Sequence, residues 1–269
     1  MKKILFSDLD GTLFKEGKSI SSKNLEALKQ MQAKGHKVVL CTGRNHIDIQ
    51  PVLKHIPIPY DYMVLCNGSY ICDKQGHILY EDHIDLNVGK KLIQEIRDRK
   101  HYTVMFCDDD GCYVLVDGKT KTLELNGLDD YDEDFDLLLN DAKRFYMLSI
   151  NDQDLSIEKV KEMQSYINQN YPELETHLNQ QYLDISPKGH NKGTGLKKLL
   201  SLLDEEYESY AIGDSYNDLS MIDYAGLGVA MDNASLEIKK HANYITLSND
   251  KGGVKHVIDN IILNFEHIK

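Results

Sequence analysis

The sequence predicts an α/β fold in which a doubly wound, Rossmann-like parallel sheet carries an inserted α+β domain. The chain has 269 residues, enough for two domains of ordinary size. Apolar runs of strand length alternate with helix-like spacings near both ends of the chain, and this alternation changes between about residues 82 and 187. The composition, 41% apolar with 18 Gly and 5 Pro, is typical of a folded chain.

The first part of the chain predicts a strand, a helix and two further strands. Residues 3–6 form an apolar run that ends at the turn sequence DLDGT, residues 8–12. Residues 22–35 have helical apolar spacing, with Ser21 or Ser22 as the cap and Gly35 as the stop. Residues 37–41 and 62–66 are further apolar runs. Strand, helix and strand in this order predict a right-handed crossover in a parallel sheet covered by helices.

The middle of the chain predicts shorter strands mixed with helices, which is typical of a separate α+β module. The predicted strands are residues 69–72, 102–106, 112–116, 144–150 and 182–185, and the predicted helices are residues 86–99 and 157–168. An acidic run at residues 129–134 is interpreted as a solvated loop rather than as a cation site.

The last part of the chain returns to regular alternation. We expect a helix at residues 192–203, a strand at 209–212, a helix at 217–225, a strand at 227–230 and a terminal helix from Gly253. Residues 1–81 and 188–269 are therefore predicted to form one core domain. Residues 82–187 are predicted to form the inserted domain.

Charge and cysteine content exclude several classes of protein. With 31 basic and 43 acidic residues the formal net charge is −12, which gives no support for nucleic-acid or anionic-membrane binding. No window approaches the roughly 18 consecutive apolar residues of a membrane span. The five cysteines form no C-x-x-C pair, and the histidines show no zinc-type spacing. We expect a cytoplasmic protein with reduced cysteines.

Polar residues gather where strands of a parallel sheet end, which is where such sheets bind ligands. Asp8 and Asp10 follow the first strand, Thr42 follows the second, and Asp214 follows a later one. Each alone has an ordinary interpretation as a turn residue or cap. Carboxylates brought together at one sheet edge would repel each other, and Mg²⁺ prefers oxygen ligands. The sequence therefore predicts a magnesium site made by Asp8, Asp214 and a main-chain oxygen near Asp10.

Four motifs in order resemble those of the haloacid dehalogenase superfamily. They are DLDGT at residues 8–12, TGR at 42–44, KG at 192–193 and GDSYND at 213–218. The 150 residues between the second and third motifs hold the insert in the position of a C2-type cap, which resembles the Cof-type branch of phosphatases. The NGS sequence at residues 67–69 is similar to that branch as well.

The resemblance implies a role for each motif residue. Asp8 is the implied nucleophile, forming an aspartyl phosphate, and Asp10 the implied general acid and base. Thr42 and Lys192 complete the implied catalytic set, and Asp218 orients its neighbours. The implied phosphate-binding residues are Leu9, Thr42, Gly43, Lys192 and Asn217, and the implied metal ligands are Asp8, Asp10 and Asp214. Arg44 contacts either substrate or merely solvent and a helix cap.

These features predict a Mg²⁺-dependent phosphatase that hydrolyses small phosphorylated metabolites. A phosphomutase or phosphotransferase using the same aspartyl phosphate is the alternative within enzymes. A non-catalytic signalling or binding protein with a phosphorylated aspartate is the alternative from another class. Sugar, cofactor and polyol phosphates all stay open as substrates, as does the oligomeric state.

Overall fold

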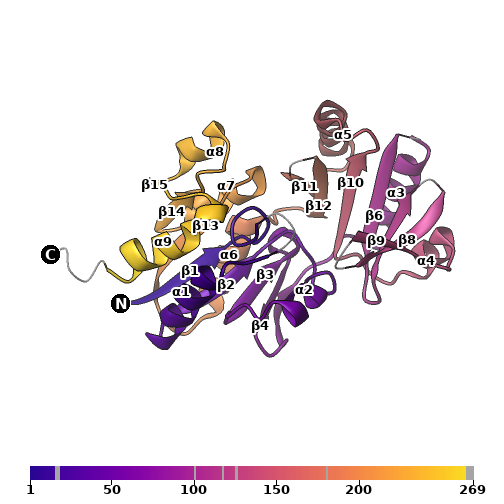
Figure 1. The fold of residues 1–269 in the computed structure, drawn as a ribbon. Helices are drawn as coiled ribbons and strands as arrows, with labels where there is room; N and C mark the ends of the chain where they lie inside the picture. Colours follow the sequence, from indigo (N-terminus) through magenta and orange to yellow (C-terminus); the bar gives the residue numbers. More distant parts are fainter. Residues whose placement is uncertain (16–18, 100, 117, 125–126, 180, 265–269) are drawn as a thin grey trace.

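A computed structural model describes residues 1–15, 19–99, 101–116, 118–124, 127–179 and 181–264. Two sheets organise these residues: the strands of the core sheet lie on the left of Figure 1, and β6 to β12 lie on the right. Among the described residues, no helix is both long and apolar enough to cross a membrane.

The core sheet has the strand order β15-β14-β13-β1-β2-β3-β4-β5. Its first six strands in this order are parallel, whereas β4 pairs antiparallel with β3 and β5 pairs antiparallel with β4. The strands are β1 (Lys2–Ser7), β2 (Lys37–Cys41), β3 (Tyr62–Leu65), β4 (Tyr70–Asp73), β5 (Ile78–Glu81), β13 (Tyr207–Gly213), β14 (Leu227–Ala230) and β15 (Tyr244–Ile245). The central position of β1 places its carboxyl end between the ends of β2 and β13.

Helices cover both faces of the core sheet because alternate strand residues are apolar on both sides. Leu5 and Val38 pack with α1, α2 and α9 on one face, and Ile4 and Val39 pack with α6 and α7 on the other. The core helices are α1 (Ser22–Ala33), α2 (Ile49–His55), α6 (Lys192–Leu202), α7 (Leu219–Tyr224), α8 (Leu236–His241) and α9 (Gly253–Val257). The predicted doubly wound α/β fold is confirmed.

The second sheet is antiparallel, with the strand order β11-β12-β10-β6-β7-β8-β9. Its strands are β6 (Tyr102–Cys107), β7 (Cys112–Val116), β8 (Lys119–Glu124), β9 (Gly127–Asp130), β10 (Met147–Asp152), β11 (Leu174–Asn179) and β12 (Tyr182–Pro187). One face packs against α3 (Leu86–Arg97), α4 (Phe135–Asp141) and α5 (Ile157–Asn170) through alternate residues such as Val104, Leu148 and Leu183. Residues of the opposite face line a cavity together with residues at the end of the core sheet.

The chain crosses between the two sheets twice, and the crossings lie together. The first follows β5 and the second follows β12. The Tyr80 hydroxyl lies 2.9 Å from Nε2 of His190, and the two rings stack. Nε2 of His190 also lies 3.5 Å from the Asp82 carboxylate. The two connections are therefore tied to each other.

Several predicted elements need correction. β4 was predicted within the irregular middle of the chain, but it pairs with β3 in the core sheet. The predicted strand at 144–150 starts three residues later, at Met147. The acidic run is not one loop, because Asp129 and Asp130 belong to β9 and Asp134 caps α4. The elements that the sequence did not predict are short or exposed: α2, β5, β8, β9, α4, β11, α8 and β15.

Candidate active site

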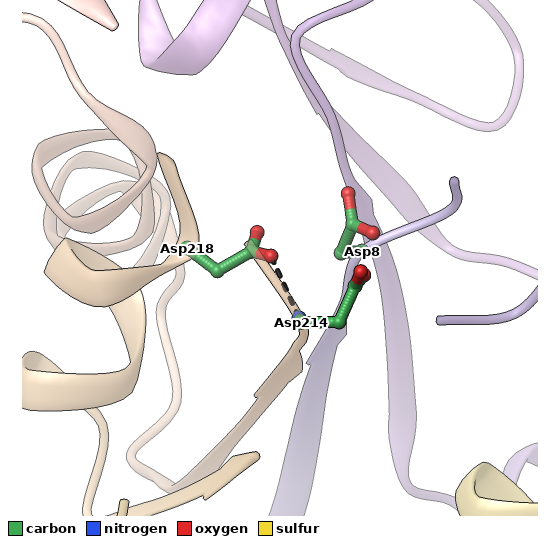
Figure 2. A group of neighbouring side chains, drawn as sticks. All are labelled: Asp8, Asp214 and Asp218. Atoms are coloured by element: carbon green, nitrogen blue, oxygen red, sulfur yellow. Dashed lines mark hydrogen bonds between the residues drawn. The ribbon is translucent and has the colours of Figure 1, made fainter. Parts of the chain in front are cut away.

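Three carboxylates meet at the carboxyl ends of β1 and β13. Asp8 follows β1, Asp214 follows β13, and Asp218 lies at the start of α7. One oxygen of each lies within 4.8 Å of the others, and Figure 2 shows the Asp218 carboxylate hydrogen-bonded to the main-chain nitrogen of Asp214. The main-chain N–H of Asp8 donates to the carbonyl of Ile212 at 3.0 Å, which ties the two strand ends together.

Lys192 supplies the buried cation of this cluster. Its Nζ donates to Oδ1 of Asp8 at 2.7 Å and to Oδ1 of Asp218 at 2.6 Å, and its side chain is 1% exposed. Burial lowers the pKa of Lys192, but Asp218 and Asp8 outweigh burial and hold this pKa above its ordinary value. Asn191 caps α6, so Lys192 is the first residue of the helix and points into the site.

The cluster keeps an excess of negative charge. Three carboxylates and one ammonium sum to −2. Burial and the charge of Asp218 raise the pKa of Asp8, against the effect of Lys192. Burial and Asp218 also raise the pKa of Asp214 to about 7. A divalent cation at this point would neutralise the excess.

The oxygen atoms that could hold such a cation can be identified from their partners. Oδ2 of Asp8 is buried and has no hydrogen-bond partner among the described residues. Oδ2 of Asp218 accepts the main-chain N–H groups of Asp214 and Ser215, each at 2.9 Å, and its Oδ1 accepts Lys192. Both oxygens of Asp218 are therefore already engaged by hydrogen bonds within the protein. The residues fit a hard divalent cation held by Asp8 and Asp214, which is the carboxylate pair that Mg²⁺ prefers.

Gly11 and Thr12 determine the position of the Asp214 carboxylate. Gly11 has φ +91°, and a Cβ built there would overlap the Asp214 carboxylate. The Thr12 hydroxyl donates to Oδ1 of Asp214 at 2.8 Å. The glycine in the DLDGT sequence is therefore required both for its backbone conformation and for the space it leaves.

Thr42 and Gly43 form a second wall of the site at the end of β2. Thr42 is 2% exposed, and its hydroxyl accepts the main-chain N–H of Arg44 at 3.2 Å. A Cβ on Gly43 would lie 2.9 Å from Oδ2 of Asp184 and 3.2 Å from the side-chain amide of Asn67. This wall is therefore held close against a residue of β12.

Arg44 lines the cavity and contacts two carboxylates. Its Nε donates to Oδ2 of Asp10 at 2.8 Å, and its terminal nitrogens donate to Oδ1 of Asp10 and Oδ1 of Asp48, each at 2.9 Å. The guanidinium is thus bound by two carboxylates, and its Asp10 contact is bidentate. The Asp10 side chain consequently points to Arg44, apart from the three-carboxylate cluster.

A cavity of about 620 Å³ joins these groups to the second sheet. Five of the predicted site residues line it: Asp8, Asp10, Thr42, Gly43 and Asn217. Lys192, Asp214 and Asp218 bind one another or Asp8 beside it. The Leu9 side chain belongs to the hydrophobic core, so only its main chain is available to a ligand.

Two residues outside the predicted set link the sheets. Asn67 accepts from Asn217 Nδ2 at 3.3 Å and donates to Oδ2 of Asp184 at 3.4 Å. Asn67 has φ 50° at the end of β3, in the left-handed region, where asparagine is favoured. The sequence does carry a signal for Asp184, which stands as a single charge between the core residues Leu183 and Ile185. Because strand side chains alternate, Asp184 faces away from that core.

Comparison with known proteins identifies the family of this chain. The sequence profile of the haloacid dehalogenase-like hydrolases matches residues 5–258. The 5-amino-6-(5-phospho-D-ribitylamino)uracil phosphatase YwtE of Bacillus subtilis (strain 168) is 29% identical over 286 aligned positions, covering 97% of this chain and 98% of its own. Pyridoxal phosphate phosphatase YbhA of Escherichia coli (strain K12) is 25% identical over 268 positions, covering 95% and 97%.

A solved structure shows the same fold. The haloacid dehalogenase-like hydrolase from B. subtilis superposes with a TM-score of 0.84 at 26% identity, covering 96% of this chain and 99% of that one. The predicted fold class, the predicted superfamily and the prediction of a phosphatase are therefore confirmed. The chain is a phosphatase that belongs to the haloacid dehalogenase-like hydrolase family.

Proposed function

We propose that this phosphatase hydrolyses small phosphorylated metabolites through an aspartyl phosphate on Asp8. The observation that carries the proposal is the state of the Asp8 carboxylate. It is 4% exposed, one oxygen is held by Lys192, the other has no hydrogen-bond partner among the described residues, and the residue lines a cavity. A carboxylate so placed is ready to bind or attack a group that enters from the cavity.

The proposed reaction has two steps. The Asp8 carboxylate attacks phosphorus, the bond from phosphorus to the ester oxygen breaks, and Asp10 protonates the leaving alkoxide. Water then attacks phosphorus, Asp10 takes its proton, and inorganic phosphate leaves Asp8 free. Asp10 is placed for this role because it lines the same cavity as Asp8, two residues along the chain.

Other residues stabilise the phosphoryl group. Lys192 lies 2.7 Å from Asp8 and offers positive charge where negative charge gathers. Thr42, Gly43 and Asn217 line the same cavity as Asp8. The Thr42 hydroxyl, the main-chain N–H of Gly43 and the Asn217 amide would donate to phosphoryl oxygens. Leu9 would contribute its main-chain N–H. Asp218 positions Lys192 and the main chain of Asp214.

Mg²⁺ is the proposed cofactor, because family phosphatases generally use it and the charge and donor set fit it. Asp8 and Asp214 would hold it, together with the main-chain carbonyl of Asp10. When bound, the ion would neutralise charge on the phosphoryl oxygens and on the carboxylates.

We propose that residues 82–187 form a cap domain on a core made of residues 1–81 and 188–269. The cap sheet supplies the far wall of the cavity, including Met105, Ser149 and Asp184. Such a wall would select substrates and exclude bulk water. The relatives named above act on a ribitylaminouracil phosphate and on pyridoxal phosphate, which favours a small organic phosphate here.

The test is release of inorganic phosphate from a panel of small phosphomonoesters, with Mg²⁺ and with a chelator. Release should require Mg²⁺ and should fall by several orders of magnitude in Asp8→Asn, which removes the nucleophile and keeps the side-chain shape. Asp223→Asn, an exposed substitution on α7, is the matched control and should keep full activity. Near-normal turnover by Asp8→Asn would exclude the proposed nucleophile. Transfer of phosphate to an added acceptor faster than to water would favour a transferase.

A further inference from the structure

The cap face that lines the cavity is divided into a polar half and an apolar half. Strand register places Asp184 of β12 opposite Ser149 of β10, Ser149 opposite Met105 of β6, and Met105 opposite Val114 of β7. All four line the cavity. The row therefore changes from carboxylate to hydroxyl to aliphatic groups across four neighbouring strands.

The other cavity residues of the cap follow the same division. The polar members lie on β11, β12 and β10 or at the adjoining end of β6, and the aliphatic members lie mainly on β6, β7 and β9. The polar set is Asn179, Tyr182, Asp184, Ser149, Asn151 and Thr103, and the aliphatic set is Met105, Val114, Val116, Leu128 and Met147. Among the described residues, helices pack on the opposite face of this sheet. Aliphatic groups facing a polar site call for an apolar ligand surface.

Asp184 is the most unusual member of the polar half. It is 6% exposed, and its neighbours are neutral donors: the Ser149 hydroxyl at 3.0 Å, the Asn67 amide and the Asn179 amide. Burial raises the pKa of this carboxyl to about 6, despite these hydrogen bonds. The charge of Lys192 acts on Asp184 without a direct ion pair, and no described residue forms one with it. A buried carboxylate in this state opposes stability. A ligand that donates to it would explain its place in the cavity wall.

The polar half lies beside the proposed phosphate site. Asp184 reaches Asn217 through Asn67, by hydrogen bonds of 3.4 Å and 3.3 Å. A Cβ on Gly43 would lie 2.9 Å from the Asp184 carboxylate. Val114 lies three strands away from Asp184 in the cap sheet. A substrate held at Asp8 therefore meets Asp184 close to its phosphoryl end and the aliphatic set farther out.

The charges on the cavity wall restrict the substrate further. The charged lining residues within the described chain are Asp8, Asp10, Asp48, Asp184 and Arg44. Arg44 is already bound by Asp10 and Asp48. A second phosphate or a carboxylate on the substrate would thus meet carboxylates and no unengaged cation of this wall.

We propose that the substrate is a phosphomonoester with a single anionic group, a hydroxyl or N–H donor for Asp184 near the phosphate, and an uncharged apolar face at its far end. Asp184 and the aliphatic set are the specificity determinants. This inference rests on the proposed phosphatase function and names its substrate class.

The test compares four probes that separate these features. Uridine 5′-monophosphate carries the ribose hydroxyls and an uncharged uracil ring, whereas ribose 5-phosphate has the hydroxyls and lacks the base. Phenyl phosphate has an uncharged ring and no hydroxyls. Fructose 1,6-bisphosphate has hydroxyls and a second anionic group. We expect the first probe to have the highest kcat/KM and the bisphosphate the lowest, with steps of about 10-fold or more.

Two variants assign the steps to residues. Asp184→Asn should lower kcat/KM for the two hydroxyl-bearing monophosphates at least 10-fold more than for phenyl phosphate. Val116→Thr keeps the side-chain volume and makes the side chain polar. It should lower kcat/KM more for uridine 5′-monophosphate and phenyl phosphate than for ribose 5-phosphate. Asp129→Asn, exposed on β9 of the same sheet, is the control and should leave the ranking intact. Equal losses on all probes, or efficient hydrolysis of the bisphosphate, would overturn the inference.

A binding experiment separates this inference from the proposed function. Calorimetric titration of the same four probes into Asp8→Asn, and into Asp8→Asn combined with Asp184→Asn, needs no turnover. If the wild type released no phosphate but Asp8→Asn bound the probes in the expected order, the hydrolytic function would fail and the specificity would stand. Binding in another order would reject the specificity whatever the activity.

Discussion

Lys192 explains why three aspartates can share one buried point. It binds Asp8 and Asp218 directly, so two of the three negative charges have a partner within the protein. Asp214 accepts the Thr12 hydroxyl and has no ion-pair partner among the described residues, so a cation from solution would complete the site. If Mg²⁺ binds here as proposed, its binding and the folding stability should depend on each other.

Removal of Lys192 should leave two buried carboxylates unpaired. We expect Lys192→Met to lower the free energy of unfolding by roughly 3–5 kcal/mol, measured by urea denaturation. Adding Asp218→Asn to this variant should recover part of the loss, because one of the orphaned charges is then removed. Additive losses in the double variant would contradict the coupling.

The pH dependence of metal binding follows from Asp214. Its pKa is raised to about 7 without metal, so the native protein binds a proton that the unfolded chain does not bind between about pH 4 and pH 7. The stability that this carboxyl contributes is lost as the pH rises through 7, and the proposed Mg²⁺ would then take the place of the proton. Saturating MgCl₂ should therefore raise Tm more at about pH 8 than at about pH 5 in differential scanning fluorimetry. Asp214→Asn should abolish the difference, and equal shifts at both pH values would refute this account.

At the scale of elements, the sequence predicts what depends on long periodic patterns and misses what depends on distant pairing. β2, β7 and β14 are found with their bounds because each is a continuous apolar run. β8 is a strand of alternating Lys and Thr whose pairing with β7 no local pattern specifies. The motif aspartates were found because they follow such apolar runs. Asp184 was not predicted as a site residue, because its importance comes from a contact with Asn67, 117 positions away.

The approach of α6 to α7 depends on Gly193. A Cβ at this position would overlap the carbonyl oxygen of Ser220, and the Gly193 N–H donates to the Ser220 hydroxyl at 3.0 Å. Gly193→Ala should push α6 outward, destabilise the fold by roughly 1–3 kcal/mol and displace Lys192. Urea denaturation and kcat should both report the change. Ser201→Ala, an exposed substitution on the same helix, should change neither the free energy of unfolding nor kcat. If Gly193→Ala also changed neither quantity, the two helices would be free to move apart.

At the scale of the molecule, the cavity is bounded by both sheets, so its size limits what reaches Asp8. A volume of about 620 Å³ suits a small organic phosphate and not a folded phosphoprotein. We expect a phosphoserine within a protein to be hydrolysed at least about 100-fold more slowly than free small phosphomonoesters. Phosphate release from a phosphorylated protein, with uridine 5′-monophosphate as the reference, measures this. Comparable rates would mean that the sheets open widely in solution.

The paired connections beside Tyr80 and His190 have a consequence for evolution. Since the chain leaves the core and returns to it at neighbouring points, the intervening hundred or so residues enter as one cassette. Exchanging this cassette would change the wall that meets the organic part of a substrate while Asp8, Lys192 and Asp214 kept their places. The same set of catalytic residues could thus acquire a new substrate specificity through replacement of one contiguous stretch of the gene.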